Sequence, residues 1–334
     1  MNKVTMEDVA KHADVSKSTV SQYINGRYEY MSKKTKQRVE ESIEELNYSV
    51  NIVAKSLKQK RTFTIGVIVA NIIHNFSTQV IRAVEDVCNK KNIHVIVCNA
   101  DDDPEKEQTY IELLLAKQID GLIVFPIDGN IEYYKKLYKA AYPIVFVDRK
   151  IEQLPIDTFL LNNEGASEMA VDHFVSKGYR EIGFVSSSLT NVTPRIERLE
   201  GFKKALVKHN VEVNKDYIIS CKVKNIRTEL KKMLLSVDRG PKAILASNDL
   251  SLIETLKFLN QNNLSIPHDV ALIGIDDVPF SDIIVPSLTT VAQPSYVIGE
   301  NAASKLLDII NNRQKKRSGN IYRFDGELIS RNSC

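Results

Sequence analysis

The sequence lacks the features that mark membrane, secreted or zinc-ribbon proteins. It has four cysteines, Cys88, Cys98, Cys221 and Cys334, and none of them stands in a C-x-x-C pair. This usage excludes a disulfide scaffold and a zinc ribbon, and it favours a reducing cytoplasm. No apolar run approaches the roughly 18 residues that cross a bilayer, because the longest stretches, such as residues 65–70, have the length of a strand. The first eight residues have no apolar core, so we expect neither a signal peptide nor a membrane partner.

The motifs of common enzymes are also missing. There is no G-x-x-x-x-G-K-[S/T] phosphate loop, no G-x-G-x-x-G after a strand and no G-x-S-x-G elbow. The six histidines are scattered along the chain and form no metal-like array. We therefore expect no catalytic residue, no metal site and no cofactor, and we predict that the protein is not an enzyme.

Length and charge divide the chain into unequal parts. A chain of 334 residues is long enough for two or three domains of roughly 100–200 residues each. The net charge is only +3, but residues 1–61 hold 12 lysines and arginines against 8 aspartates and glutamates, a net of +4. All the positive excess therefore lies in the first sixth of the chain. By itself this excess fits a solvated face as well as a nucleic-acid contact.

The first part of the chain has the pattern of three short helices. Thr5 followed by Asp8 predicts an N-cap and a first helix, and Ser16 predicts the cap of a second helix over residues 17–24. A third helix is expected from a cap at Ser32 to about Asn47, where its apolar side chains complete a small core. Two short helices joined by a tight turn are typical of a helix-turn-helix, whose second helix lies in the major groove of DNA.

Polar side chains of the second helix are suited to DNA contact. Some are long enough or exposed enough to reach base edges, and others are short groups that fit phosphates. The candidates are Lys17, Ser18 and Gln22 for bases, and Thr19, Ser21 and Asn25 for phosphates.

Residues 50–58 form a short helical stretch that leaves two interpretations open. Helices under about 12 residues are marginal in water, so this one is expected to fold only when something packs against it. A leucine at the end of a helix in the minor groove can insert between base steps and kink the duplex, which suits Leu57. Alternatively, the stretch is a plain linker, and Leu57 docks on the next domain.

From residue 64 onward, short β-branched runs alternate with helical stretches. Such alternation predicts parallel sheets covered by helices on both faces. About 270 residues suit two such sheets, so we predict an α/β core of two Rossmann-like lobes around a cleft. The expected strands are 65–70, 94–98, 121–125, 144–147, 182–185, 217–221, 243–246 and 270–275, and the clearest expected helices are 78–89, 104–116 and 195–210.

Taken together, these segments resemble the lactose-repressor (LacI/GalR) family of transcriptional regulators. The opening stretch VTMEDVAKHADVSKSTVS at residues 4–21 is similar to the start of that family, and ELNY at 45–48 with AKSL at 54–57 is similar to its third-helix end and hinge helix. The resemblance continues through GYREI at 178–182, RLEGF at 198–202, SND at 247–249 and PSLTT at 286–290. The order and spacing of these motifs carry the resemblance. Two departures are a turn at 25–32 that is one residue longer than usual and Asn162-Asn163 in place of Asp-Asn.

The resemblance implies a domain organisation. A helix-turn-helix headpiece is expected at residues 1–49, a hinge helix and linker at 50–62, and a periplasmic-binding-protein-like core at 63–334. Within the core, lobe one is expected at about 63–160 and 292–320, and lobe two at about 161–291 and 321–334. The chain then crosses between the lobes near residues 160, 290 and 320.

The resemblance also implies two sets of site residues. Lys17, Ser18 and Gln22 read bases, and Leu57 is the minor-groove wedge at the centre of the operator. The full DNA-contacting set is Thr5, Ser16, Lys17, Ser18, Thr19, Ser21, Gln22, Asn25, Ser32, Asn51, Ala54, Lys55 and Leu57. The effector positions map onto Phe76, Asp148, Arg198, Asn248 and Asp276, and we add Arg195 because it lies at the same helix start. Ligands of open α/β sheets bind beyond the carboxyl ends of strands, where most of these residues stand.

The sequence therefore predicts a cytoplasmic, homodimeric, sequence-specific DNA-binding regulator, and a repressor in particular. It would bind double-stranded operator DNA and respond to a small molecule, a sugar or sugar acid, between its lobes. The alternative is a cytoplasmic sugar-binding receptor or enzyme of the same α/β architecture that does not bind an operator. Steep salt dependence of binding to duplex DNA separates the two, because phosphate neutralisation releases counterions.

Overall fold

The computed structural model describes residues 4–49, 61–235, 240–312 and 319–334, and its chain divides into two units, Met1–Thr62 and Phe63–Cys334. The described residues of the first unit form the helices α1 (Met6–His12), α2 (Lys17–Ile24) and α3 (Lys33–Glu45). No helix among the described residues has the length and apolar character needed to cross a membrane.

Side-chain caps set the start of each helix in the first unit. Thr5 and Asp8 form a reciprocal capping box, in which the Thr5 backbone N–H donates to Asp8 Oδ2 over 2.8 Å. Ser16 and Ser32 accept from the backbone N–H groups three residues ahead of them, at 3.2 and 3.1 Å. These hydroxyls satisfy N–H groups that a helix end leaves without partners. Below the caps, a small apolar core closes around Val9, Ala10, Ala13, Val20 and Val39.

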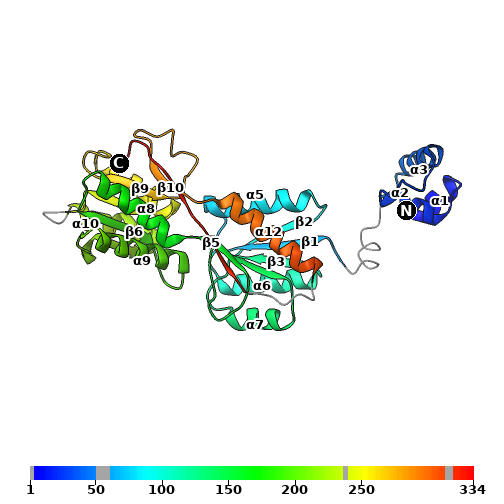
Figure 1. Cartoon of the computed structure of the whole chain (residues 1–334), viewed down its shortest axis with the longest axis horizontal. Helices are drawn as coiled ribbons and strands as arrows, with labels where there is room; N and C mark the ends of the chain where they lie inside the picture. Colours follow the sequence, from blue (N-terminus) through cyan, green and yellow to red (C-terminus); the bar gives the residue numbers. More distant parts are fainter. Residues whose placement is uncertain (1–3, 50–60, 236–239, 313–318) are drawn as a thin grey trace. The chain divides into compact units, whose positions relative to one another are not determined.

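The second unit consists of two α/β lobes, each built on a six-stranded sheet (Figure 1). The first sheet has the order β11-β5-β4-β3-β1-β2 and the second has the order β12-β10-β9-β8-β6-β7. Every pairing in the first sheet is parallel, and in the second only the pairing of β10 with β12 is antiparallel. The strands are β1 (Thr64–Val69), β2 (His94–Asn99), β3 (Gly121–Val124), β4 (Ile144–Val147), β5 (Thr158–Leu161), β6 (Ile182–Ser187), β7 (Ile218–Cys221), β8 (Ala243–Ala246), β9 (Ala271–Ile275), β10 (Thr289–Ala292), β11 (Ile321–Phe324) and β12 (Glu327–Ile329).

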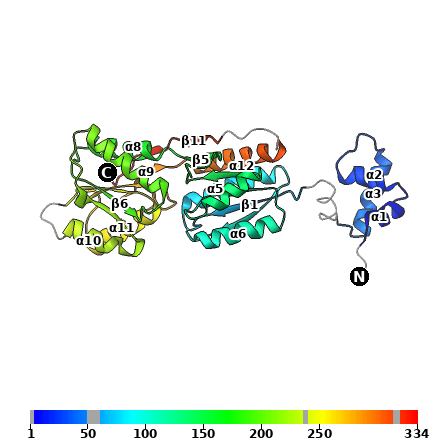
Figure 2. The ribbon, with the colours of Figure 1, turned by 90° about the horizontal axis from the view of Figure 1, so that it is seen from below.

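Helices cover both faces of each sheet. In lobe one, α5 (Asn75–Asn89) packs with α12 (Ser295–Asn311) on one face, while α6 (Pro104–Ala116) and α7 (Ile131–Lys139) lie on the other (Figure 1). In lobe two, α8 (Asn163–Ser176) packs with α9 (Thr193–Lys208), and α10 (Ile226–Leu235) packs with α11 (Asp249–Gln261) on the opposite face (Figure 2). Two 3-10 turns, Lys215–Tyr217 and Val223–Asn225, flank β7. Burial on both faces explains why the central strands read as continuous apolar runs.

The chain crosses between the lobes three times. It leaves the first sheet after β5 at Asn162, returns after β10 at Gln293, and leaves again after β11 at Asp325. The expected third crossing near residue 320, with 321–334 in lobe two, is wrong. Residues 321–324 pair in register with β5 of the first sheet, and only β12 belongs to lobe two. The strands β5, β10, β11 and β12 were not predicted from the sequence.

Close helix packing in lobe two provides a test of the fold. A Cβ atom on Gly201 would lie 2.5 Å from the Glu164 backbone, so α9 approaches α8 through this glycine. Gly201→Ala should therefore lower the free energy of unfolding of the core by about 1–3 kcal/mol, because overpacking forces the two helices apart. Denaturant unfolding of the purified protein measures the change. The exposed neighbour provides the control, because Glu200→Ala should leave the midpoint almost unchanged; equal midpoints for the two variants would contradict this packing.

Candidate functional site

A polar cavity lies where the two lobes face each other. The space that the centre of a water-sized molecule can reach is about 40 Å³, and residues from both lobes line it. All six residues predicted to contact an effector, Phe76, Asp148, Arg195, Arg198, Asn248 and Asp276, are in this lining. Their neighbours in the wall include His74, Ser77, Arg149, Pro194 and Gln293. The structure therefore brings together residues that are up to 200 positions apart in the sequence, and their role in ligand binding stays a prediction.

Strand ends position the two carboxylates of the cavity. Asp148 follows β4 directly and Asp276 follows β9 directly. Both have a left-handed backbone, with φ of 66° for Asp148 and 94° for Asp276. Non-glycine residues seldom adopt this conformation, and where they do it often marks a functional position. The turn after each strand thus aims an acidic side chain into the space between the lobes.

Asp276 is the most deeply buried of these carboxyl groups. It accepts hydrogen bonds from Gln293 Nε2 at 2.5 Å and from the backbone N–H of Asp249 at 3.2 Å. Burial raises the pKa of Asp276 to about 6, although the nearby charge of Arg198 opposes the shift. With this pKa the carboxyl group is mostly ionised at neutral pH, so a ligand hydroxyl meets mainly a hydrogen-bond acceptor there.

Three arginines, Arg149, Arg195 and Arg198, also line the cavity. Arg198 is buried and donates through Nε to Asn163 Oδ1 at 2.9 Å and through Nη1 to the Ser247 carbonyl at 2.7 Å. Arg149 is also buried and donates to Asp102 at 2.6 Å. These fixed contacts hold the guanidinium groups in place before any ligand arrives, which favours binding by reducing the loss of side-chain entropy.

Arg195 differs from the other two arginines. It is partly buried and donates through Nη1 to the Ser188 carbonyl at 2.9 Å. Burial lowers the pKa of Arg195, and the positive charge of Arg149 lowers it further. Among the described residues, no carboxylate lies within ion-pairing distance of Arg195.

A histidine–aspartate pair joins the lobes at the edge of the cavity. His74 Nδ1, at the start of α5, lies 2.6 Å from Asp249 Oδ1, at the start of α11. The other oxygen of Asp249 accepts the backbone N–H of Asn75 at 3.0 Å. Burial opposes protonation of His74, but its hydrogen bond to Asp249 and the charge of that carboxylate raise the pKa of His74 overall. Sequence patterns give no signal for this pair, since its two residues lie 175 positions apart.

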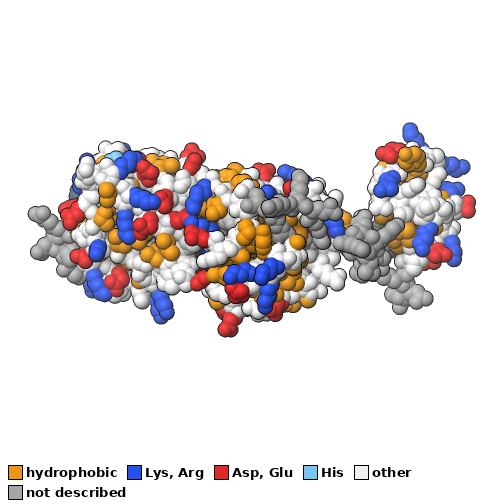
Figure 3. Space-filling model, turned by 60° about the horizontal axis from the view of Figure 1, so that its bottom comes forward, with side chains coloured by type: hydrophobic (Ala, Val, Ile, Leu, Met, Phe, Trp, Pro, Cys, Tyr) orange, Lys and Arg blue, Asp and Glu red, His pale blue; other side chains and the backbone are white. Residues whose placement is uncertain are grey.

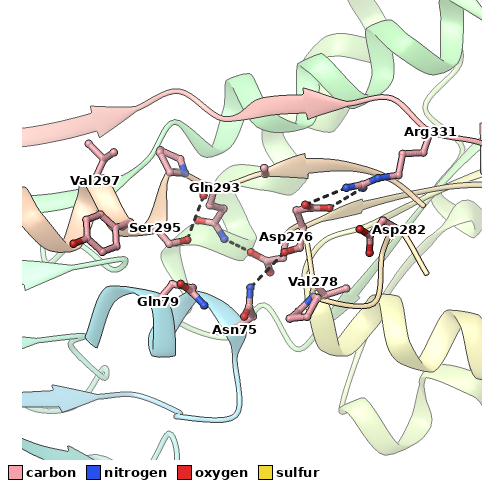
Figure 4. A pocket seen from close by; sticks show the side chains of 14 residues that line it. Asn75, Gln79, Asp276, Val278, Asp282, Gln293, Ser295, Val297 and Arg331 are labelled. Atoms are coloured by element: carbon pink, nitrogen blue, oxygen red, sulfur yellow. Dashed lines mark hydrogen bonds and ion pairs between the residues drawn. The ribbon is translucent and has the colours of Figure 1, made fainter. Parts of the chain in front are cut away.

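A second, more open pocket lies on the other side of the Asp276–Gln293 pair (Figure 4). Figure 4 shows the amide of Gln293 turned toward Asp276, and Asn75 directed at the loop that follows β9. Asp277, the residue after Asp276, forms an ion pair with Arg331 at 2.7 Å and accepts a hydrogen bond from the Thr290 hydroxyl. Most polar groups of this pocket are therefore already bonded to one another.

Two lining residues, Arg149 and Gln293, were not assigned to the site from the sequence. Arg149 immediately follows the assigned residue Asp148. Gln293 was not considered, because β10 was not predicted and its end therefore gave no signal. The rule that sites lie beyond strand ends finds Gln293 once that strand is known.

Some of the predicted DNA-contacting residues of the first unit are exposed on α2, and others cap its helices. Lys17 and Ser18 are exposed at the start of α2 and Gln22 is partly exposed one turn later. Thr5, Ser16 and Ser32 cap the three helices, so their hydroxyls already have backbone partners. The rest of the predicted contacts fall into two groups: Thr19, Ser21 and Asn25 lie on or just after α2, and Asn51, Ala54, Lys55 and Leu57 lie outside the described residues.

No metal-binding group stands out in the described part of the chain, where no three His, Cys, Asp or Glu side chains are grouped to hold an ion. Cys88 is buried, and burial raises the pKa of its thiol to about 11. A thiol with so high a pKa is a poor nucleophile at neutral pH.

Two family models match the chain. Residues 5–51 match the bacterial regulatory proteins of the lacI family, and residues 171–334 match the periplasmic binding protein-like domain.

Relatives match almost the whole chain. The probable HTH-type transcriptional regulator EndR of Paenibacillus polymyxa is 46% identical over 313 residues, which cover 93% of this chain and 92% of EndR. The HTH-type transcriptional regulator KdgR of Bacillus subtilis (strain 168) is 32% identical over 98% of this chain and 97% of its own length. Among solved structures, the Lac repressor dimer bound to operator and the anti-inducer ONPF has a TM-score of 0.84, 26% identity and 99% coverage of both chains.

These comparisons confirm the predicted fold class, and they confirm a transcriptional regulator rather than an enzyme. The chain belongs to the lacI family of bacterial regulatory proteins.

Proposed function

We propose that this protein is a cytoplasmic repressor that binds operator DNA as a homodimer and responds to a polyhydroxylated metabolite between its lobes. The observation that carries the proposal is the cavity that places Asp148, Arg198, Asn248 and Asp276 around one space in a lacI-family core. Carboxylates, amides and guanidinium groups donate to or accept from hydroxyls, while the buried ring of Phe76 offers an apolar wall for C–H groups. A sugar or a sugar acid has both hydroxyl groups and apolar C–H faces.

The headpiece supplies the proposed DNA contact. Its second helix exposes Lys17 and Ser18 at the N-terminal end, which is the end that approaches base edges in helix-turn-helix complexes. On the face of the core in Figure 3, basic and acidic side chains alternate and form no single basic stripe. We therefore assign phosphate and base contacts to the headpiece and to the proposed hinge residues, including Leu57.

Exposed apolar side chains of the core support the homodimer. Ile283 and Val285, in the loop after Asp282, are 75% and 97% exposed, and Ile73 of lobe one is 65% exposed. Contiguous exposed apolar groups are typical of protein–protein contacts. A twofold dimer also matches a pseudo-palindromic operator, because each headpiece then meets an equivalent half-site.

The proposed response follows from thermodynamic linkage. An effector changes operator affinity only if it binds the DNA-competent and DNA-incompetent states with different affinity. A ligand that contacts both lobes meets this condition, because it favours one relative placement of the lobes. Operator binding measured with and without candidate carbohydrates tests the proposal directly. Operator affinity that no carbohydrate changes would contradict it.

The base-reading role of α2 has its own test. Gln22→Ala should change the preferred base at a particular operator position, at a cost of about 1–3 kcal/mol for the original base, since a bidentate amide contact is lost. Selection from a random duplex library followed by sequencing measures the preference. Gln37→Ala, an exposed glutamine of α3, is the control and should keep the wild-type preference. An even loss of affinity for all sequences would make Gln22 a phosphate contact instead.

Arg198 tests the effector site. Arg198→Gln should weaken effector binding about 10- to 100-fold while operator affinity is retained, because a hydrogen bond from a charged donor is lost inside the cavity. Calorimetric titration and operator binding by the same preparation measure the two effects. Arg227→Gln, an exposed arginine that pairs with Glu254, should change neither. A normal effector response in Arg198→Gln would remove this residue from the site.

The His74–Asp249 pair predicts a pH dependence of stability. Because its pKa is raised in the folded state, His74 stabilises the closed lobes fully below its unfolded pKa of about 6.5, and this contribution is lost as pH rises through the raised value. At pH 6 the melting temperature of the wild type should exceed that of His74→Gln. The expected difference is about 2–4 °C for each 1 kcal/mol that His74 adds to the free energy of unfolding, and it should vanish at alkaline pH.

Two charged neighbours, Asp276 and Arg195, also face His74. Both residues remain in the variant, but the pKa of Asp276 depends on His74, so the difference in melting temperature reports the histidine together with the acidic groups coupled to it. A difference that grows as pH rises would contradict the assignment.

A further inference from the structure

The charges around the interlobe cavity are unequally paired. Three guanidinium groups line it, from Arg149, Arg195 and Arg198, against two carboxyl groups, from Asp148 and Asp276. Arg149 forms ion pairs with Asp102 at 2.6 Å and with Asp148 at 3.9 Å, so its positive charge is already compensated. Arg195 has only the carbonyl of Ser188 as a partner, and no carboxylate of the described residues pairs with it.

A partly buried guanidinium without a counter-ion is costly, because burial removes part of its hydration. The positive charges of Arg149 and Arg198 add to this cost, and the more distant carboxylates of Asp102 and Asp148 offset part of it. The guanidinium also keeps donors that Ser188 does not use, and its planar fork matches a carboxylate in a bidentate arrangement. Within the described part of the chain, Arg198 also lacks a carboxylate partner but already donates two hydrogen bonds, whereas Arg195 donates one, so Arg195 has more donors left for a negatively charged ligand.

The remaining walls suit hydroxyl groups. Asn248 uses its side-chain oxygen to cap α11, accepting from Ser251 N at 3.0 Å, which leaves its Nδ2 group as a donor. Asp276 accepts hydrogen bonds as a carboxylate, as it does from Gln293 Nε2 and the Asp249 backbone N–H. Phe76 lies edge-on to Phe125, with ring centres 6.0 Å apart, and its ring is held in the cavity wall. The cavity thus has one cationic corner and a hydroxyl-binding side.

We propose, on the basis of the proposed function above, that the effector is a monoanionic sugar acid whose carboxylate binds Arg195 beside Arg149 and whose hydroxyls contact Asn248 and Asp276. One negative charge is favoured over two, because the carboxyl groups of Asp148 and Asp276 face the same space. A phosphorylated sugar, which carries close to two charges at neutral pH, meets repulsion from these two carboxylates.

The test compares sugars that differ in one group. Glucose is paired with glucuronate, galactose with galacturonate, and sorbitol with gluconate, and glucose 6-phosphate provides the dianion. Each is titrated into the purified full-length protein by calorimetry, with the shift in melting temperature as a second readout. We expect at least one acid to bind at least 10-fold tighter than its neutral partner and tighter than the phosphate.

Variants of Arg195 locate the charge recognition. Arg195→Gln should lose about 10- to 100-fold in affinity for the acid but little for the neutral partner, because only the acid uses the guanidinium charge. Arg195→Lys keeps the charge without the planar fork and should recover part of that loss. Arg180→Gln, an exposed arginine of the same lobe, is the matched control and should bind like the wild type.

Each outcome decides the proposal. Equal or tighter binding of the neutral partners, tighter binding of glucose 6-phosphate, or wild-type affinity of Arg195→Gln for the acid overturns the charge assignment while leaving carbohydrate control in place. If no carbohydrate of either kind binds, both this inference and the proposed effector class fail. Loss of operator binding with intact sugar-acid binding would contradict only the proposed regulatory function.

Discussion

The structure of the core depends on one constraint: two parallel sheets direct the carboxyl ends of their central strands toward the same space. Backbone groups at strand ends lie outside the ladder, so the chain must turn there, and polar side chains in the turns are left to face the gap. In lobe one this turn places Asp148 after β4, and in lobe two it places Asp276 after β9. The site is therefore a consequence of topology, with its chemistry supplied by a few residues in each turn.

Polar groups buried in this gap make the relative placement of the lobes sensitive to what fills it. Asp276 and Arg198 carry opposite charges at low exposure, and their hydrogen bonds go to neighbours within lobe two. The pair between His74 and Asp249 is different, because it joins the two lobes. A ligand that competes for these partners, or that supplies a missing counter-ion to Arg195, changes the free energy of closure. Such a change is what linkage requires of an effector.

Much of this arrangement is predictable from local sequence, because local rules govern it. The caps at Thr5, Ser16 and Ser32 follow from a hydroxyl placed before an amphipathic stretch, and the structure confirms each of them. The helix over residues 104–116 begins at Pro104 behind a cap from Asp103, as its sequence predicts. The central strands are long apolar runs, so their positions were predicted to within about two residues. The sequence did not predict the register of the strands or their order in each sheet.

The unpredicted part consists of short or distant features. A strand of four residues such as β11 is too short to show a periodicity. Its position is fixed by pairing with β5. Next to this pairing, the Asn320 backbone N–H donates to Asp157 Oδ1, 163 positions earlier in the chain. That pairing keeps residues 321–324 in lobe one and moves the third crossing to Asp325. The ion pair of Arg323 with Glu197, at 2.8 Å, then ties this strand to α9 of lobe two. Because α9 also holds Arg195 and Arg198, a strand invisible to sequence patterns helps to position the cationic side of the cavity.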